Sequence, residues 1–308
     1  MGSGSRVGQY ERRFFQGELM HEEKEEGAFN IVKTFREYEV LKAERGGYTL
    51  LKSGNTIGTL SEAKVEEERI VFKLSQGTNL EVSEKGVREI LNPEKAEVCG
   101  LMAADGYICK LRWIKGEGVT YEASLTTINE RLAEVFEKLS KEIYGVIPHR
   151  DIEYHKTKEG KAKHYKVAIY SKKVVFDLLD LSIKGPARYE FHPPLKHLDE
   201  EGKRAYLRGF FSGDGTVALK DEGRYEIRID SSYRDGLEEL RKMFIDLGFH
   251  PYEIHEKKYV REGKEYKSYY FTIPSEEHLK FIEEIGSEKE EHINRFRLIK
   301  QRGKERRD

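Results

Sequence analysis

A nine-residue pattern that occurs twice constrains this chain more than any other feature of its sequence. Residues 98–106 read VCGLMAADG and residues 207–215 read LRGFFSGDG, and the two aspartates are 109 residues apart. In each copy two small residues stand four positions apart, as Gly100 and Ala104 do in the first. A helix through the pattern therefore carries them on one face. Because small residues let helix backbones approach closely, the pattern predicts a tightly packed pair of helices.

Each copy ends in Asp-Gly, at Asp105 and Asp214, and the glycine predicts a left-handed helix stop. If the two helices pack through their small faces, both carboxylates lie close together at helix C-termini, where the helix dipole disfavours negative charge. Oxygen ligation of a divalent metal would relieve that repulsion. A single Asp-Gly is a common hairpin turn, but two copies that each end a helix before a β-like run predict a functional pair.

A second landmark supports an internal duplication. Gly145-Val-Ile-Pro is matched by Gly248-Phe-His-Pro, 103 residues later, and each copy has the pattern helix, two strands, helix, two strands, helix. All seven prolines lie at position 93 or later. We expect a small β-rich N-terminal module of unknown role over residues 1–92 and a first repeat over 93–185. A stiff linker over 186–198 leads to the second repeat, over 199–308, which carries a basic C-terminal tail.

Composition excludes several classes of protein. Lysine and arginine total 55 against 56 acidic residues, for a formal net charge of −1, which excludes a polycation that binds nucleic acid by bulk charge. Four glutamines and six asparagines accompany the charged residues, a mix typical of thermophiles. Two cysteines exclude a disulfide framework, no apolar run reaches a membrane span, and the opening residues read as a flexible lead. These features predict a monomeric cytoplasmic protein, from a bacterium or archaeon, that needs no protein partner.

The two patterns, their spacing and the helix–strand order over residues 93–300 resemble the LAGLIDADG homing endonuclease family in its single-chain form. The resemblance implies an α/β (α+β) fold, in which two pseudo-symmetric αββαββα units form a saddle over double-stranded DNA. It also implies a mobile intron or similar element as the context of the gene.

The resemblance assigns roles to individual residues. Asp105 and Asp214 would bind Mg²⁺ (or Mn²⁺) and direct cleavage of one strand each, and Ala104 and Gly213 would complete the metal ligands. The sixth motif position, often acidic in the family, is alanine in the first copy and serine in the second, but it is not the metal ligand.

Family members also carry a basic residue downstream of each motif. Lys184 lies 79 residues after Asp105, and Lys289 lies 75 residues after Asp214. Their equivalent placement makes them candidates for catalytic charge stabilisation or for positioning the attacking water, although two surface lysines would look the same in the sequence.

Alternation along the predicted strands separates an inward apolar face from an outward polar face. Ile227 and Ile229, for example, alternate with charged residues. Arginine, lysine, acidic and hydroxyl side chains can read base edges in a major groove. The predicted DNA contacts are Lys110, Arg112, Ser124, Thr126, Lys166, Lys220, Arg224, Glu226, Arg228 and Asp230.

The leading hypothesis is a sequence-specific homing endonuclease that makes metal-dependent double-strand breaks in a long DNA target. The alternative is a non-cleaving DNA-binding protein, or an RNA maturase, on the same scaffold; a self-splicing intein is disfavoured because the chain ends Arg-Arg-Asp. The basic residues between 295 and 307 could grip phosphates or form a solvated tail. The ten histidines show no clustering in the sequence, which predicts surface or packing roles.

Overall fold

The computed structural model describes residues 29–43, 46–53, 55–74, 76–112, 119–157, 160–181, 183–184, 189–220, 223–261 and 263–305. It separates into two units, Met1–Ile90 and Leu91–Asp308. Residues 186–188 of the predicted linker and 306–308 of the predicted basic tail lie outside the described residues.

The first unit consists of β-strands over its described residues. They form two four-stranded antiparallel sheets, ordered β1-β2-β3-β4 and β5-β6-β7-β8. Alternate residues such as Tyr38 and Val40 of β2 pack with Ile70 and Phe72 of β6 in one apolar core. The strands are β1 (Phe29–Phe35), β2 (Tyr38–Ala43), β3 (Tyr48–Lys52), β4 (Asn55–Leu60), β5 (Ala63–Val65), β6 (Arg69–Lys73), β7 (Thr78–Ser83) and β8 (Gly86–Leu91).

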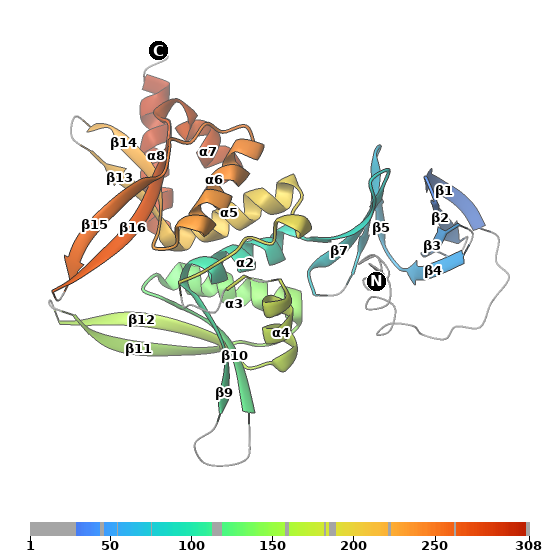
Figure 1. Cartoon of the computed structure of the whole chain (residues 1–308), viewed down its shortest axis with the longest axis horizontal. Helices are drawn as coiled ribbons and strands as arrows, with labels where there is room; N and C mark the ends of the chain where they lie inside the picture. Colours follow the sequence, from blue (N-terminus) through green and yellow to red (C-terminus); the bar gives the residue numbers. More distant parts are fainter. Residues whose placement is uncertain are drawn as a thin grey trace, which may run out of the picture. The chain divides into compact units, whose positions relative to one another are not determined.

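The second unit confirms the predicted fold of two αββαββα repeats, followed by one further helix (Figure 1). The first repeat comprises α2 (Pro93–Asp105), β9 (Gly106–Arg112), β10 (Val119–Thr127), α3 (Glu130–Tyr144), β11 (His149–Thr157), β12 (Gly160–Ile169) and α4 (Lys172–Asp180). The second comprises α5 (Glu200–Asp214), β13 (Gly215–Leu219), β14 (Tyr225–Ser231), α6 (Arg234–Asp246), β15 (His255–Arg261), β16 (Lys264–Ile273), α7 (His278–Glu284) and the additional α8 (Glu290–Glu305). None of the helices in the described part of the chain is long and apolar enough to cross a membrane.

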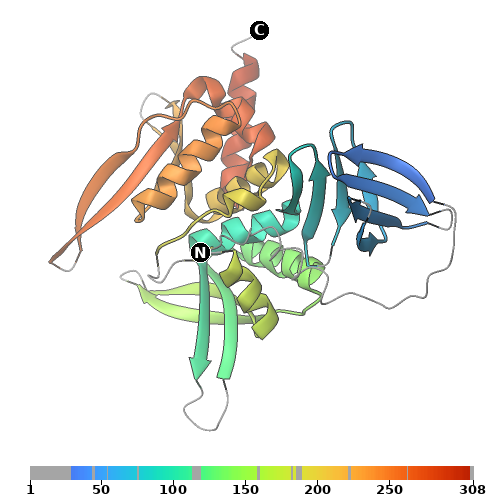
Figure 2. The ribbon, with the colours of Figure 1, turned by 45° about the vertical axis from the view of Figure 1, so that its right-hand side comes forward.

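The two sheets of this unit have equivalent strand orders, β9-β10-β12-β11 and β13-β14-β16-β15. They flank the central α2–α5 pair, and the hairpins β11–β12 and β15–β16 extend to the same side of it (Figures 1 and 2). One face of each sheet is buried against helices through alternate residues such as Leu125, Val167, Ile227 and Phe271. The opposite face of each sheet carries the polar residues.

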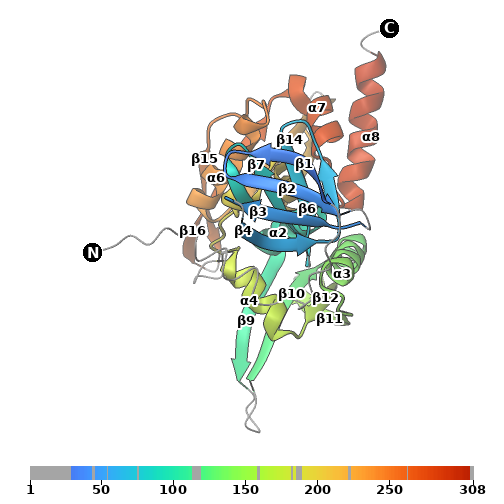
Figure 3. The same cartoon turned by 90° about the vertical axis from the view of Figure 1, so that its right-hand side faces the viewer.

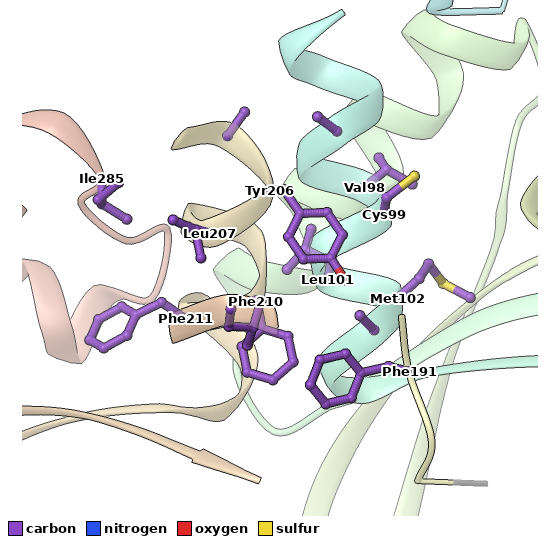
Figure 4. Close-up of a cluster of buried hydrophobic side chains, with 14 of the residues drawn as sticks. Val98, Cys99, Leu101, Met102, Phe191, Tyr206, Leu207, Phe210, Phe211 and Ile285 are labelled. Carbon is purple, nitrogen blue, oxygen red and sulfur yellow. The ribbon is translucent and has the colours of Figure 1, made fainter. Parts of the chain in front are cut away.

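Helices α2 and α5 pack with their backbones in close contact, as the small residues predicted. A Cβ atom on Gly100 would overlap the carbonyl oxygen of Tyr206, and one on Gly209 would overlap that of Glu97. Large side chains such as Tyr206, Phe210 and Phe191 fill the space around this contact (Figure 4), with the rings of Phe191 and Phe210 at 4.8 Å between centroids. The glycines therefore bring the two motif helices together.

Helices α2 and α5 begin at residues that cap them, but they do not end in the predicted conformation. Asn92 accepts a hydrogen bond from the Lys95 amide at 2.9 Å, and Asp199 accepts one from the Gly202 amide at 2.9 Å. The predicted left-handed stop is wrong, because Gly106 and Gly215 are extended, with φ of −78° and −79°. After each of these two helices the chain folds back sharply, so that a Cβ atom on Gly106 or Gly215 would overlap the last turn of its helix.

Gly209→Ala should lower the free energy of unfolding by about 3 kcal/mol or more, because its methyl group would displace the backbone of α2. Gly202→Ala, in the same helix, is the matched control: its nearest neighbours are movable side-chain atoms at 3.3 Å. Urea unfolding would measure both. Equal stability of the two variants would contradict the close helix packing.

Candidate functional site

The two motif aspartates lie together at the C-terminal ends of α2 and α5. A Cβ on Gly213 would lie 2.6 Å from the Cβ of Ala104 and 3.2 Å from Oδ2 of Asp105. Each aspartate is the last residue of its helix. The helix packing thus places two carboxylates side by side where both helix dipoles present their negative ends.

Burial and mutual repulsion make these carboxyl groups unusually basic. The pKa of Asp214 is raised to about 7, first by burial and next by the charge of Asp105, while Lys184 opposes the shift. Burial also raises the pKa of Asp105, against the opposing charges of Lys289 and Lys184. The structure therefore brings both predicted lysines into the electrostatic environment of the aspartate pair.

Lys184 makes direct contact with the end of the first motif. Its Nζ donates to the Ala103 carbonyl at 2.6 Å and approaches the Ala104 carbonyl at 3.4 Å. Residue 184 also forms an isolated β-bridge with Phe191, which fixes its backbone. The ammonium group supplies positive charge at the carbonyl ends of α2.

Asp105 and Asp214 supply two carboxylates to the predicted Mg²⁺ (or Mn²⁺) site, a donor set that such an ion uses together with carbonyl oxygens and water. Of the predicted ligands, the Ala104 carbonyl faces the Lys184 ammonium, which leaves Asp105 and Asp214 as the charged ligands. Within the ranges that the structure describes, no three histidine, cysteine, aspartate or glutamate side chains are grouped to hold a metal ion. Lys184 and Lys289 oppose the raised pKa values of the two aspartates but do not cancel the shift.

A buried hydrogen-bond network beside Asp214 was not predicted. Ser212 Oγ donates to the Arg208 carbonyl at 2.7 Å and accepts from the Glu288 amide at 2.8 Å. It also lies 3.2 Å from Ser287 Oγ, which lies 3.0 Å from His292 Nδ1. Burial lowers the pKa of His292 to about 3, so this imidazole is neutral. The network fixes the segment that carries Lys289, and serine at the sixth motif position was its one sequence signal.

An ion pair joins the two motif helices at the far end of their contact. The Arg208 guanidinium donates to Glu97 Oε2 from Nη2 at 2.7 Å and from Nε at 3.1 Å. Burial raises the pKa of Glu97, and Arg208 opposes that shift. The pair links α2 to α5 across a separation of 111 residues in sequence, which is why sequence reasoning missed it.

The second repeat presents its predicted contact residues on one sheet face, opposite the buried Ile227 and Ile229. Arg228 lies between two carboxylates, with Nε 2.8 Å from Asp230 Oδ2 and Nη1 3.5 Å from Glu226 Oε1. Lys220 adds a contact to Glu226 at 3.1 Å, and the Lys220 amide donates to the carbonyl of the exposed Arg224 at 2.7 Å. The face is a line of alternating charges.

The predicted DNA contacts of the first repeat lie on strands β9, β10 and β12. Thr126 pairs with Lys166, and Ser124 Oγ donates to the buried Glu122 at 2.8 Å, so these residues share the polar face. The strand register places Lys110 and Arg112 opposite Tyr121 and Val119, in the alternate set of positions. Their side chains lie outside the described residues, so their contact with DNA stays a prediction.

Two of the basic C-terminal residues, Arg295 and Arg302, make contacts within the second repeat. Helix α8 runs along one side of the second repeat (Figure 3), where Arg295 donates to the Val217 carbonyl and Arg302 to the Gly223 carbonyl. The Arg302 guanidinium also lies 5.2 Å from the centre of the Tyr225 ring. These two arginines hold the β13–β14 hairpin. Arg306 and Arg307 lie outside the described residues.

Comparison with known proteins confirms the predicted resemblance: residues 201–286 match the family model of a LAGLIDADG-like domain. The "Probable cell division protein WhiA" of Streptococcus agalactiae is 31% identical over 170 residues, which cover 53% of this chain and 55% of that protein. This chain therefore spans about half the length of the curated relatives it matches.

Two solved structures are similar to the chain. I-DmoI in complex with DNA and Mn has 22% identity and a TM-score of 0.46, covering 63% of this chain and 96% of that one. The N-terminal LAGLIDADG domain of DUF199/WhiA has 16% identity and a TM-score of 0.41, covering 66% and 86%.

The prediction of a homing endonuclease is wrong. The relatives matched at about 30% identity, from Streptococcus and Lactococcus, are named probable cell division proteins, not nucleases.

Asp214→Asn should stabilise the protein at pH 8 by about 2–4 kcal/mol. Its carboxyl pKa is about 7 in the folded state against an ordinary value of 3.8. Keeping it ionised therefore costs folding free energy above pH 7, and the cost disappears as pH falls toward 4. Urea unfolding at pH 8 and about pH 4.5 would measure a gain that shrinks in acid; a pH-independent difference would contradict the raised pKa.

Lys184→Met should destabilise the protein at pH 8 by about 2–3 kcal/mol, since it leaves Lys289 as the one lysine of the pair near the carboxylates. In the Asp214→Asn background the same change should cost less, because one of the charges that it compensates is gone. A double-mutant cycle measures this coupling. Additive effects would show that Lys184 acts through its backbone-carbonyl contact alone.

Proposed function

We propose that this chain is a DNA-binding protein that holds double-stranded DNA on the polar sheet faces of its LAGLIDADG-like unit and does not cleave it. The observation that carries the proposal is the hydrogen bond from Lys184 Nζ to the Ala103 carbonyl at 2.6 Å, beside the aspartate pair. A nuclease of this kind needs its paired carboxylates to recruit a divalent ion. In this chain Lys184 contacts the end of the first motif, and both Lys184 and Lys289 oppose the raised pKa values of the aspartates.

The sheet faces support the binding half of the proposal. Arg228, Glu226 and Asp230 offer hydrogen-bond donors and acceptors side by side on one strand, which is the chemistry that distinguishes base pairs in a major groove. Two such sheets flank the α2–α5 pair with equivalent strand orders. Because the chain has a net charge of −1, affinity must come from local arrangement and not from bulk charge.

The assignment of WhiA relatives to cell division fits a role for DNA binding without cutting. In this role the aspartate pair is part of the structure, with Lys184 and Lys289 nearby, and it does not take part in catalysis. The polar sheet faces bind the DNA. The same scaffold then serves as a binder.

Selection of bound fragments from a genomic DNA pool, followed by incubation of the same fragments with Mg²⁺ or Mn²⁺, tests both halves. We expect retained duplexes to stay uncut on a sequencing gel. Reproducible cleavage that Asp105→Asn abolishes would overturn the proposal, whereas failure to retain any duplex would remove its binding half.

Arg228→Gln should weaken duplex binding by about tenfold, because the variant loses the guanidinium between the two carboxylates of the sheet face. Arg234→Gln is the matched control, since Arg234 is an exposed arginine paired with a glutamate but lies on α6, away from that face. Fluorescence anisotropy at fixed salt would measure both. Equal losses would indicate non-specific charge effects and contradict the assigned face.

A further inference from the structure

Three histidines that are scattered in the sequence share the polar face of the first repeat. The register of β11 with β12 places His149 and His155 opposite Ala168 and Ala162, and His164 opposite Glu153. The alternate positions of β12, such as Val167, are buried against the helices. The three imidazoles therefore lie on the face that the proposed function assigns to DNA.

Each exposed imidazole of β11 contacts a carboxylate on the same strand. His149 Nε2 lies 2.9 Å from Asp151 Oδ2, and His155 Nε2 lies 3.1 Å from Glu153 Oε2. The rings of His155 and His164 are 4.3 Å apart between centroids. These contacts become ion pairs only when the imidazoles are protonated.

The other ionisable groups on this face do not supply excess positive charge. Lys166 of β12 lies 2.9 Å from Glu122 of β10, so these two charges compensate each other. Tyr170 follows β12 with its ring 6.4 Å from that of His149, and β9 contributes Tyr107 and Cys109 by register. With neutral imidazoles, the described part of the face presents one lysine against three carboxylates, and phosphates would be repelled.

The second repeat has the opposite balance on its equivalent face. Among the side chains that the structure describes on this face, four are basic and two are carboxylates, and one histidine, His255, lies opposite Tyr270. The tyrosines of positions 259 and 266 stack at 5.7 Å between centroids beside them. The basic residues are Lys220, Arg224, Arg228 and Lys257, and the carboxylates are Glu226 and Asp230.

We propose that the two repeats hold DNA unequally: the second repeat grips phosphates at any pH near neutrality, and the first engages only when His149, His155 and His164 are protonated. The inference rests on the proposed function. Protonation would add three positive charges and convert a face of net negative charge into one of net positive charge. Duplex affinity should therefore rise as the pH is lowered from 8, because protonation adds positive charge to the face that meets the phosphates.

The test is anisotropy with a labelled mixed-sequence duplex of about 40 base pairs, at constant low salt, between about pH 8 and pH 5.8. The wild-type chain should bind about tenfold or more tightly at the lower pH. A triple variant, His149→Gln, His155→Gln and His164→Gln, should change by about twofold or less. It retains both motif aspartates, so their titration contributes equally to both proteins.

Two further variants test whether the pH response comes from the histidines and carboxylates of the first repeat. His255→Gln, on the second repeat, is the matched control and should keep the wild-type pH response. Asp151→Asn with Glu153→Gln should bind more tightly than wild type at pH 8, because two repelling charges are gone. A triple variant with the full wild-type pH response, or no gain from removing the carboxylates, would overturn the inference; absence of duplex binding at every pH would instead remove the proposed function.

Discussion

The contact between the backbones of α2 and α5 is the interaction on which the rest of this unit depends. Gly100 and Gly209 leave no space for a side chain between the helices, so the two repeats are joined along their motifs. That approach brings Asp105 and Asp214 together and orients the two sheets on either side of the helix pair. One packing constraint thus sets the carboxylate pair and the two sheet faces at once.

Placing two carboxylates at adjoining helix ends creates an electrostatic cost that the fold must offset. Burial raises the pKa of both aspartates, and lysines from two distant segments lie close enough to oppose the shift. Lys184 reaches the site from the end of the first repeat, and Lys289 is fixed by the Ser287 hydrogen bond to its amide at 3.2 Å. The lysines reduce this electrostatic cost but do not remove it, since the pKa values of both aspartates stay raised.

The sheet faces show how symmetric repeats acquire different chemistry. The strand orders are equivalent, yet one face gathers histidines and carboxylates while the other gathers arginine, lysine and tyrosine. Net charge of the whole chain hides this difference, because opposite local excesses cancel. Local charge on each face, set by strand register, governs where a phosphate backbone can lie.

The sequence by itself determined the duplicated αββαββα architecture, the close helix pair and the two aspartates, because periodicity and small-residue spacing are local properties of the chain. It placed Glu226, Arg228 and Asp230 on one face for the same reason. Tertiary structure alone decided the partners of Lys184, the Glu97–Arg208 pair and the gathering of His149, His155 and His164. These features depend on register and on contacts between residues far apart in sequence, which no local pattern encodes.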